Sequence, residues 1–309
     1  MNILVTGGAG FIGSHITNAY VDAGHKVVVV DNLSSGERRF INPKAIFYPM
    51  DILDPEVETV MKKERIEVIN HHAAQISVSD SVSNPVFDAN NNIVGTLKLL
   101  QYASLLKIKK FIFASTGGAM YGEQETFPAS EEHPCRPLSP YGISKLSAEN
   151  YLNYFYREYG LNRTILRYSN VYGPHQNPHG EAGVVAIFCQ LLAKDDKPII
   201  TGDGKQTRDF ISVRDVVQAN CIALDPACSG TFNVGTGIET NVNHLTQNLI
   251  NVSGKSIPIK YGPARNGEQR RSVIDYRKFR IRFNWKPEIS LQEGLLETYQ
   301  FFQNSAIAL

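Results

Sequence analysis

The sequence predicts an α/β protein with a doubly wound parallel sheet, followed by a smaller α/β domain. Short β-branched runs alternate with longer helical stretches through the first half of the chain, as in successive strand–helix–strand units. Most of these runs are nearly continuous in apolar residues and do not alternate between polar and apolar, which is typical of parallel strands buried on both faces. After Tyr168 the elements become shorter and less regular, so we expect a second unit there.

The strands and helices of the first half follow from this pattern. The six runs expected to form the sheet are Asn2–Thr6, Lys26–Asp31, Ala45–Pro49, Glu67–His71, Lys110–Ser115 and Asn162–Tyr168. Helices are expected at Ser14–Ala23, Pro55–Lys63, Asn84–Leu106 and Ser139–Tyr159. The third begins with a proline, which is tolerated because the first N–H groups of a helix have no intrahelical partner.

A loop-like segment marks the expected domain boundary near residue 170. Residues 170–183 are rich in Gly, Pro, Asn and His, which favours a loop over regular structure. We therefore expect one domain over residues 1–170 and another over residues 171–309, with some later segments returning to the first sheet. The second part is expected to hold helices near Val184–Ala193, Val242–Val252 and Leu291–Phe302, and strands near Phe210 and Phe232.

Charge and composition exclude several classes of function. The 309 residues include 31 basic and 30 acidic side chains, so a net charge of +1 offers no electrostatic footprint for nucleic acid or an anionic membrane. No apolar run approaches the roughly 18 residues that a membrane span needs, and the N-terminal segment lacks the basic start of a signal peptide. The four cysteines lack metal-ligand spacing, so we expect reduced thiols, no metal site and a cytoplasmic protein.

Three glycines follow the first strand directly and precede the first helix. Gly7, Gly10 and Gly13 form a G-x-x-G-x-x-G pattern. Glycines permit a tight turn and close approach of the backbone, and the N-terminus of the following helix presents N–H groups to a phosphate. A plain tight connection is the alternative, but the strand–turn–helix context favours a Rossmann-type dinucleotide site.

An acidic residue ends the second expected strand. Asp31 lies about 20 residues past the glycines, where a carboxylate can accept hydrogen bonds from the adenosine ribose. The same charge would repel a 2′-phosphate, and Asn32 and Leu33 follow it rather than an arginine, so NAD is favoured over NADP. Asp51, just after the third strand, is placed either to meet the adenine edge or to cap the next helix.

A tyrosine and a lysine stand four residues apart in the fourth expected helix. Tyr141 and Lys145 therefore share one helix face. An ammonium beside a phenol favours the phenolate, so we expect the pKa of the phenol to fall from about 10 toward working pH. Such a phenolate can remove a proton from a substrate hydroxyl. Most Tyr-x-x-x-Lys pairs are solvated helix faces, but this one directly follows a Ser139-Pro140 helix start.

A second candidate segment lies at the carboxyl end of the fifth strand, where ligands of open α/β sheets bind. Thr116 offers a hydroxyl there that can bridge the substrate and the Tyr141 oxygen, and Gly117 and Gly118 leave room for a sugar. A polar strand end with a glycine turn is the alternative. Together with the glycine motif and the Tyr–Lys pair, this segment indicates hydride chemistry on a hydroxyl.

The order of these motifs resembles that of the extended short-chain dehydrogenase/reductase superfamily, and most closely that of the UDP-glucose 4-epimerase family. The resemblance covers essentially the whole chain, through GGAGFIGSH, DNLSSG, HHAAQISV, NNIVGTL, STGGAMYG, SPYGISK, LRYSNVYGP, TRDFISVRDV and FNVGTG. It implies an NAD-binding Rossmann domain at residues 1–170 and a nucleotide-sugar-binding domain at residues 171–309. It also implies tightly held NAD, a UDP-sugar substrate, and a homodimer built on the helices at Asn84–Leu106 and Ser139–Tyr159.

The resemblance assigns roles to individual positions. Thr116, Tyr141 and Lys145 would be the catalytic set, with Tyr141 taking the proton of the sugar 4-hydroxyl while C4 passes a hydride to NAD. The cofactor-binding positions would be Gly7, Gly10, Phe11, Ile12, Gly13, Asp31, Asn32, Asp51, Ile52, Ala73, Ala74, Gln75, Asn92, Tyr141, Lys145 and Tyr168. The substrate-binding positions would be Thr116, Asn170, Arg208, Arg265, Glu268 and Ser272.

Two features bear on the reaction and its substrates. Dehydratases of the superfamily carry an Asp-Glu pair directly after the threonine, whereas Gly117 and Gly118 stand here, so elimination of water lacks its acid and base. In an ungapped count, Ser272 falls where strict glucose/galactose enzymes carry a bulky tyrosine, so we expect room for an N-acetyl group.

The resemblance therefore implies an NAD-dependent 4-epimerase that works through a 4-keto intermediate. Its expected substrates are UDP-glucose and UDP-galactose, together with UDP-N-acetylglucosamine and UDP-N-acetylgalactosamine. One alternative is another nucleotide-sugar epimerase or reductase, for example one acting on a UDP-uronic acid. A non-catalytic NAD-binding scaffold is the other.

Overall fold

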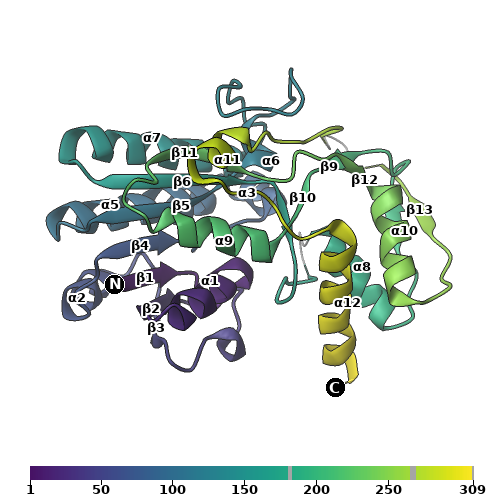
Figure 1. The fold of residues 1–309 in the computed structure, drawn as a ribbon, viewed down its shortest axis with the longest axis horizontal. Coiled ribbons are helices and arrows are strands. Elements are labelled where there is room, and N and C mark those ends of the chain that lie inside the picture. The colour runs from purple at the N-terminus through teal and green to yellow at the C-terminus, as the bar shows by residue number, and fades with distance from the viewer. Residues whose placement is uncertain (180–182, 265–268, 308–309) are drawn as a thin grey trace.

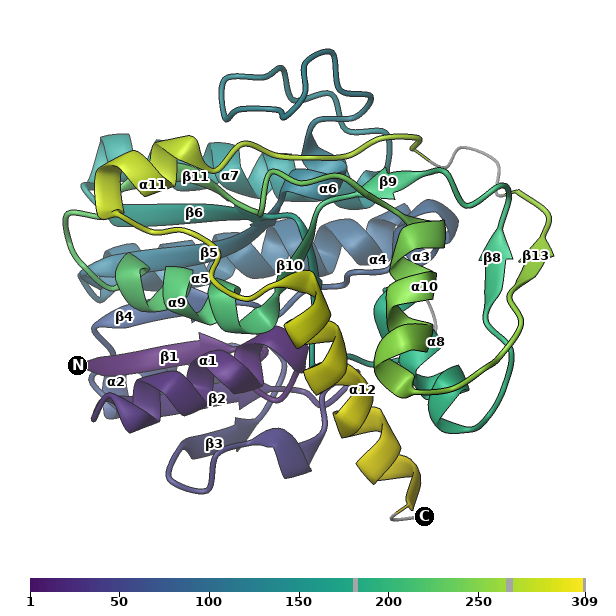
Figure 2. The same ribbon diagram turned by 45° about the vertical axis from the view of Figure 1, so that its right-hand side comes forward.

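A parallel sheet of seven strands forms the centre of the molecule (Figure 1). The computed structural model describes residues 1–179, 183–264 and 269–307. The strand order is β11-β6-β5-β4-β1-β2-β3, with all neighbours parallel. The strands are β1 (Asn2–Thr6), β2 (Lys26–Asp31), β3 (Ile46–Pro49), β4 (Val68–His71), β5 (Lys110–Thr116), β6 (Asn162–Tyr168) and β11 (Gly230–Val234). Helices cover both faces (Figure 2), so the predicted doubly wound α/β class is confirmed.

Successive side chains of a central strand point to opposite faces of the sheet and pack in two separate hydrophobic cores. In β1, Ile3 and Val5 join one core while Leu4 joins the other, and all three are fully buried. This burial on both sides explains why the three central residues of the strand are all apolar. The helices over the first core are α1 (Phe11–Asp22) and α9 (Val213–Ala223), and those over the second are α2 (Glu56–Lys63), α5 (Gly95–Leu105) and α7 (Pro140–Tyr159).

Helix α7 has chemically defined ends. Ser139 Oγ accepts a hydrogen bond from Gly142 N (3.2 Å), which satisfies one of the free N–H groups of the first turn. Pro140 occupies the first helical position, where its missing N–H costs nothing. Gly160 ends the helix in the left-handed conformation with φ +68°, which a side chain would disfavour. The helix is therefore a fixed platform for the side chains on its inner face.

The chain returns to the first sheet after residue 170. β11 pairs with β6 from Gly230↔Thr164 to Val234↔Tyr168, and α9 packs against α1. Helix α11 (Arg277–Phe283) covers the same core and buries Phe279 completely. Residues from the second half of the chain therefore complete the sheet of the first.

The remainder of the second half forms a smaller lobe beyond the carboxyl ends of the strands (Figure 1). Three helices surround its core: α8 (Val184–Ala193), α10 (Val242–Ser253) and α12 (Leu291–Ile307). Short paired strands complete it: β7 (Asn170–Tyr172) with β10 (Phe210–Ser212), β9 (Thr207–Arg208) with β12 (Thr240–Asn241), and β8 (Ile199–Thr201) with β13 (Lys260–Gly262). No helix among the described residues is both long enough and apolar enough to cross a membrane.

The structure corrects the sequence prediction at several short elements. The segment predicted as a loop over 170–183 begins with β7, because pairing with β10 satisfies its backbone. The single helix predicted over Asn84–Leu106 is divided into α4 (Pro85–Ala89), a π-helical turn called η2 (Asn90–Val94) and α5. Helical elements that the sequence interpretation did not predict are η1 (Arg38–Phe40), α3 (Val78–Ser83), α6 (Gly117–Met120) and α9.

Candidate active site

The predicted cofactor-binding segments gather at the carboxyl edge of the sheet around β1. β1 lies between β2 and β4, where the strand order reverses. At such a point the loops that follow the two adjacent strands run to opposite faces of the sheet. Open α/β sheets bind ligands in the crevice between these loops. The glycine loop after β1, Asp31 at the end of β2 and the Ala73–Gln75 turn after β4 all lie at this edge.

The glycine loop forms a cradle in which side chains do not fit. Gly7 has φ +71°, and a Cβ atom on it would lie 2.6 Å from Ala73 N. A Cβ atom on Gly13 would lie 2.1 Å from Gly7 O, because α1 approaches the loop so closely. Gly10 at the start of α1 gives no side-chain cap, and Phe11–Gly13 contain no acidic residue. This helix N-terminus is thus suited to an anion, and the cradle fits the pyrophosphate of a dinucleotide.

Backbone N–H groups fix the Asp31 carboxylate beside the cradle. Its Oδ2 accepts a hydrogen bond from Ala9 N (2.9 Å) and its Oδ1 from Leu33 N (2.8 Å). A carboxylate has about four acceptor sites, so these two bonds leave others for ribose hydroxyls. The position of Asp31 therefore fits its predicted role.

Asp51 forms an Asx turn. Its Oδ1 accepts a hydrogen bond from Leu53 N (2.8 Å), and its Oδ2 accepts one from Asn32 Nδ2 (2.7 Å). Helix α2 begins only at Glu56 and has another residue at its N-cap, so the alternative that Asp51 caps it is wrong. Asn32 and Asp51 thus join the ends of β2 and β3, next to the buried Ile52.

Asn92 of η2 holds the turn that follows β4. Gln75 N donates to Asn92 Oδ1 (3.0 Å), and Asn92 Nδ2 donates to Gln75 O (2.9 Å). Ala73 N lies 3.3 Å from its acceptor, Thr6 Oγ1, at the residue before the glycine loop. The structure thus brings Ala73, Ala74, Gln75 and Asn92 together beside the cradle, while their contact with a cofactor stays a prediction.

Tyr168 lies deeper in the fold. Its hydroxyl accepts a hydrogen bond from Asn220 Nδ2 of α9 (2.9 Å) and lies 3.2 Å from His72 Nε2. The side chain packs in the core beneath α1 and α9, and this burial raises the pKa of its phenol far above the ordinary value. Tyr168 is therefore a neutral hydrogen-bonding group, and its predicted place at the nicotinamide end of the cofactor stays a prediction.

Thr116 ends β5 and caps the short helix α6. Its Oγ1 accepts a hydrogen bond from Ala119 N (3.1 Å). A Cβ atom on Gly118 would lie 3.8 Å from both Thr116 Oγ1 and Asn170 Oδ1. The threonine hydroxyl and the asparagine amide therefore lie on either side of one small space, which the glycine keeps free of a side chain.

Tyr141 and Lys145 lie in the first two turns of α7. A Cβ atom on Gly142 would lie 2.7 Å from Ala119 O, so α7 packs closely on α6 directly beside Tyr141. Lys145 is buried, and its Nζ donates a hydrogen bond to Ala114 O of β5 (3.0 Å). The same Nζ lies 5.9 Å from the centre of the Tyr141 ring. The phenol and the amine thus meet at the carboxyl end of β5.

Burial moves the pKa values of this pair in opposite directions. Desolvation raises the pKa of Tyr141, and the negative charge of Asp88 raises it further. Desolvation lowers the pKa of Lys145 to about 8, against the opposing influence of Asp88 and Glu149. The prediction that the amine brings the pKa of the phenol down is therefore wrong for the chain alone, because loss of hydration and the charge of Asp88 both raise that pKa.

Two of the residues predicted to bind the substrate, Asn170 and Arg208, lie on short strands of the smaller lobe. Arg208 is on β9 and partly buried. Ser272 is buried, and the N–H of the next residue, Val273, is hydrogen-bonded to the segment that follows α6. The residue after Ser272 is thus joined to the segment between α6 and α7, while Arg265 and Glu268 lie outside the described residues.

The sequence interpretation missed a buried ion pair behind the Tyr–Lys pair. Arg167 of β6 donates to Glu149 of α7 through Nε (3.0 Å) and Nη2 (2.7 Å), with the two side chains 8% and 3% exposed. Ser115 Oγ also donates to Glu149 (2.5 Å), and Arg167 Nη1 donates to Tyr121 OH (3.0 Å). Burial alone would lower the pKa of Arg167, but the hydrogen bonds and charge of Glu149 outweigh it and raise that pKa. The available signal was the four-residue spacing of Glu149 from Lys145.

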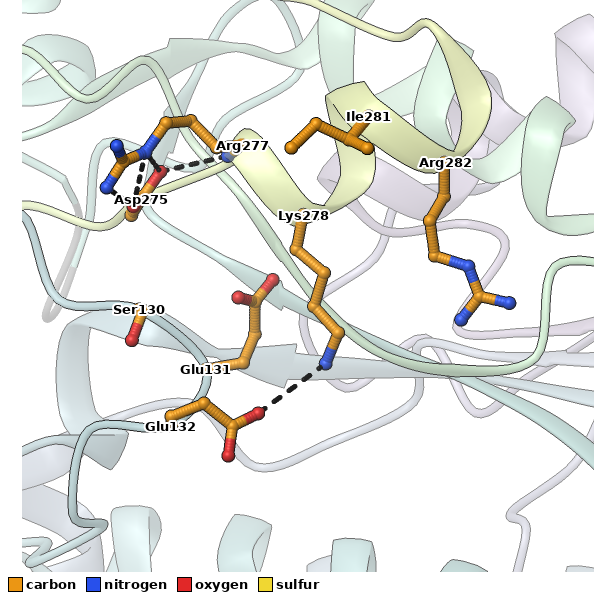
Figure 3. Close-up of a pocket in the computed structure, with 8 residues that line it drawn as sticks. All are labelled: Ser130, Glu131, Glu132, Asp275, Arg277, Lys278, Ile281 and Arg282. Carbon is orange, nitrogen blue, oxygen red and sulfur yellow. Dashed lines mark hydrogen bonds and ion pairs between the residues drawn. The ribbon is translucent and has the colours of Figure 1, made fainter.

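A surface pocket lies away from this site, and the described residues contain no metal cluster. The pocket in Figure 3 is lined by Ser130–Glu132, Asp275 and α11, and by none of the predicted site residues. Arg277 pairs with Asp275 (2.6 Å) and Lys278 lies 4.0 Å from Glu132, so its charges largely neutralise one another. No group of three His, Cys, Asp or Glu side chains in the described part of the chain could hold a metal ion.

Known proteins resemble this chain over nearly its whole length. Its fold matches the crystal structure of UDP-glucose 4-epimerase from Thermotoga maritima with UDP-glucose, with a TM-score of 0.96 and 48% identity over 99% of this chain and 100% of that one. It matches UDP-glucose 4-epimerase from Thermus thermophilus in complex with NAD, with a TM-score of 0.94 and 40% identity over 99% and 100%. UDP-N-acetylglucosamine 4-epimerase from Methanobrevibacter ruminantium M1, in complex with UDP-N-acetylmuramic acid, matches with a TM-score of 0.94 and 36% identity over 98% of each chain. Residues 3–235 match the model of the NAD dependent epimerase/dehydratase family, and the chain belongs to this family within the extended short-chain dehydrogenases/reductases.

Proposed function

We propose that this protein is an NAD-dependent UDP-hexose 4-epimerase in which Tyr141 is the acid–base group. The observation that carries the proposal is the position of the Tyr141–Lys145 pair and Thr116 at the same sheet edge as the glycine cradle. The structure of the similar enzyme from Thermotoga maritima contains UDP-glucose, and that of the enzyme from Thermus thermophilus contains NAD. These two complexes support UDP-glucose as substrate and NAD as cofactor here. Asp31 supports NAD over NADP, because a 2′-phosphate would meet its carboxylate.

Each member of the catalytic set has a distinct task in this proposal. Tyr141 takes the proton of the sugar 4-hydroxyl as that oxygen becomes a carbonyl, and it returns a proton when the carbonyl is reduced. NAD, when bound, supplies the acceptor and then the donor of the hydride at C4. Lys145, with a pKa of about 8, remains mostly charged at neutral pH and stabilises the phenolate. Thr116 holds the substrate oxygen. Because the 4-keto sugar turns over between the two hydride transfers, C4 is inverted without net oxidation.

The glycines after Thr116 favour epimerisation over loss of water. A Cβ atom on Gly117 would lie 2.8 Å from Ile274 Cδ1, so an acidic residue at this position would have to displace a buried side chain. Gly118 leaves open the space beside Asn170. The pair of acids that a dehydratase uses is therefore absent here, and its first position has no room for a side chain.

Formation of UDP-galactose from UDP-glucose tests the proposal directly. The purified protein should interconvert the two sugars without added reductant and should retain NAD through gel filtration. NAD binding without conversion of any UDP-hexose would contradict the proposal and favour the scaffold alternative.

We further propose that the enzyme also acts on the N-acetylated pair, because Ser272 offers a small side chain at the expected pocket wall. The similar UDP-N-acetylglucosamine 4-epimerase of Methanobrevibacter ruminantium supports this range. The variant Ser272→Tyr should lower kcat/KM for UDP-N-acetylglucosamine by about 10- to 100-fold, since overfilling a packed site typically costs 1–3 kcal/mol. Turnover of UDP-glucose is the internal control and should change by less than about threefold. Equal changes for both substrate pairs would show that Ser272 does not form this wall.

We also propose a homodimer through the outer faces of the helices around α7. These helices are packed against one another, and their outer faces carry a set of exposed apolar side chains. A patch of this kind marks an interaction surface, and a second copy of the chain would cover it by two-fold symmetry. Its members are Ile76, Val82, Val86, Phe87, Val94, Ile143, Tyr151 and Tyr154.

A charge placed in this patch should separate the protomers. Phe87, with 51% of its surface exposed, can be changed to Glu without disturbing the core. In a symmetric dimer Phe87→Glu would bury two carboxylates, so light scattering should report a monomer. The matched control is Ile281→Glu on α11, a residue 82% exposed outside the patch, which should leave the dimer intact. If the Phe87→Glu protein kept the mass of a dimer in light scattering, this face would not be the dimer interface.

A further inference from the structure

We propose that Asp88 is a positioning residue for the reaction: its carboxylate fixes the helix that carries Tyr141 and Lys145 against the turn expected to bind NAD. The inference deepens the proposed function and rests on it. Asp88 lies in α4, a helix of five residues whose Val86 and Phe87 are exposed, yet Asp88 itself is fully buried. No sequence motif marks it.

The Asp88 carboxylate contacts two other segments at once. Its Oδ2 accepts a hydrogen bond from Ser144 Oγ of α7 (2.5 Å). Its Oδ1 accepts one from Asn92 Nδ2 (2.9 Å) and a longer one from Gln75 Nε2 (3.3 Å). Ser144 directly precedes Lys145, so the carboxylate joins the helix of the catalytic pair to the turn beside the cradle.

Buried hydrogen bonds extend this connection to the glycine loop. Thr96 Oγ1 donates to Asn92 O (2.7 Å) and lies 3.0 Å from His71 Nε2. His71 Nδ1 lies 2.7 Å from Thr6 Oγ1, at the last residue before the loop. Burial lowers the pKa of His71 well below its ordinary value, so the imidazole is neutral. Asp88 is thus the charged end of a chain of contacts that runs from the phosphate cradle to α7.

The charge of Asp88 has no cation among its hydrogen-bond partners in the described residues, which are a hydroxyl and two amides. A carboxylate buried in this way is costly unless a charge nearby offsets it. Asp88 of α4 and Glu149 of α7 raise the pKa of Lys145. The ammonium of Lys145 in turn lowers the pKa values of His71, at the end of β4, and of His72, which follows it. Both histidines are neutral at working pH and Glu149 is already paired with Arg167, so Asp88 is the acid that offsets the ammonium of Lys145.

The variant Ser144→Ala tests the mechanical connection. It removes the one hydrogen bond from α7 to Asp88 and leaves the bonds to Asn92 and Gln75. Because small displacements of catalytic groups are costly, kcat per bound NAD should fall about tenfold, with KM for the UDP-sugar unchanged. The control is Ser147→Ala on the same helix, whose hydroxyl bonds only the backbone of Ile143 (2.9 Å) and whose loss should change kcat by less than about twofold.

The variant Asp88→Asn tests the charge while keeping the shape. Loss of a negative neighbour favours the phenolate of Tyr141, so the acid limb of the kcat–pH profile should move to lower pH. The ionisation of Tyr141 can be read without turnover, from tyrosinate absorbance of the NAD-loaded protein after subtraction of the Tyr141→Phe spectrum. Its midpoint should move in the same direction.

The assignment stands only if both variants respond in this way. Normal turnover per bound NAD in Ser144→Ala, or an unmoved pH profile in Asp88→Asn, overturns it, and so does a loss of folded protein alone. Tyr141→Phe separates the two levels of inference. If Tyr141→Phe retains wild-type turnover, Tyr141 is not the acid–base group and the role inferred for Asp88 is wrong as well. If Tyr141→Phe loses turnover while Ser144→Ala and Asp88→Asn behave like wild type, only the role of Asp88 is wrong.

Discussion

Replacement of Tyr141 by phenylalanine is expected to lower kcat by about 10²- to 10⁴-fold, the range that a positioned acid–base group supplies. The change removes only the phenolic oxygen. The ring remains in the first turn of α7, with Lys145 Nζ 5.9 Å from its centre. NAD retention and the melting temperature should therefore stay at wild-type values, and KM should change little.

The measurement is the initial rate of UDP-glucose conversion, with the NAD content of the same sample determined after denaturation. Tyr156→Phe is the matched control, because Tyr156 lies on the same helix, is exposed and is outside the set of side chains proposed to form the dimer contact. It should leave kcat within about twofold, as surface changes usually do. More than a tenth of wild-type kcat in Tyr141→Phe would mean that another group moves the proton.

The second large effect is on stability. Glu149→Gln should lower the free energy of unfolding by about 3–5 kcal/mol, because it leaves the buried Arg167 guanidinium without its counter-charge. Ser115 and Tyr121 cannot replace that charge, since both are neutral donors or acceptors. Urea titration followed by circular dichroism would report the change as a lower midpoint at a similar slope.

Two further variants test whether the loss of stability comes from burial of the unpaired charge or from loss of an ion pair in general. Glu125→Gln breaks an exposed pair with Arg136, whose side chains are 58% and 69% exposed, and should cost less than about 1 kcal/mol. Replacing Glu149 and Arg167 together by leucine and methionine should recover much of the lost stability, because no unpaired charge remains. Equal losses for Glu149→Gln and Glu125→Gln would contradict this explanation.

The central sheet could be predicted from sequence because its physical cause is local. Asn2–Thr6 and Lys26–Asp31 have apolar centres and occur as strands with those bounds, since burial on both faces leaves little room for polar residues. Helix α9 carried a usable signal that the interpretation overlooked. Ser212 Oγ caps it by accepting from Arg214 N (3.2 Å), and Asp215 stands three residues after the cap.

Other features depend on contacts that no local pattern contains. β7 is a strand only because β10 lies beside it, and the two are about 40 residues apart in the chain. Asp88 gains its partner on α7 only when the fold brings Ser144 against it. The four-residue spacing of Tyr141 and Lys145 predicted their proximity but not their loss of hydration, which sets the direction of both pKa shifts.

The pairing of β11 with β6 also constrains how the chain can fold as it leaves the ribosome. Until residue 234 has emerged, the outer edge of β6 lacks its hydrogen-bonding neighbour, and the hydrophobic layer under α9 and α11 is incomplete. An open strand edge of this kind invites pairing with other chains. The exposed edge of β6 in the nascent N-terminal half therefore needs protection until β11, synthesised more than 60 residues later, pairs with it.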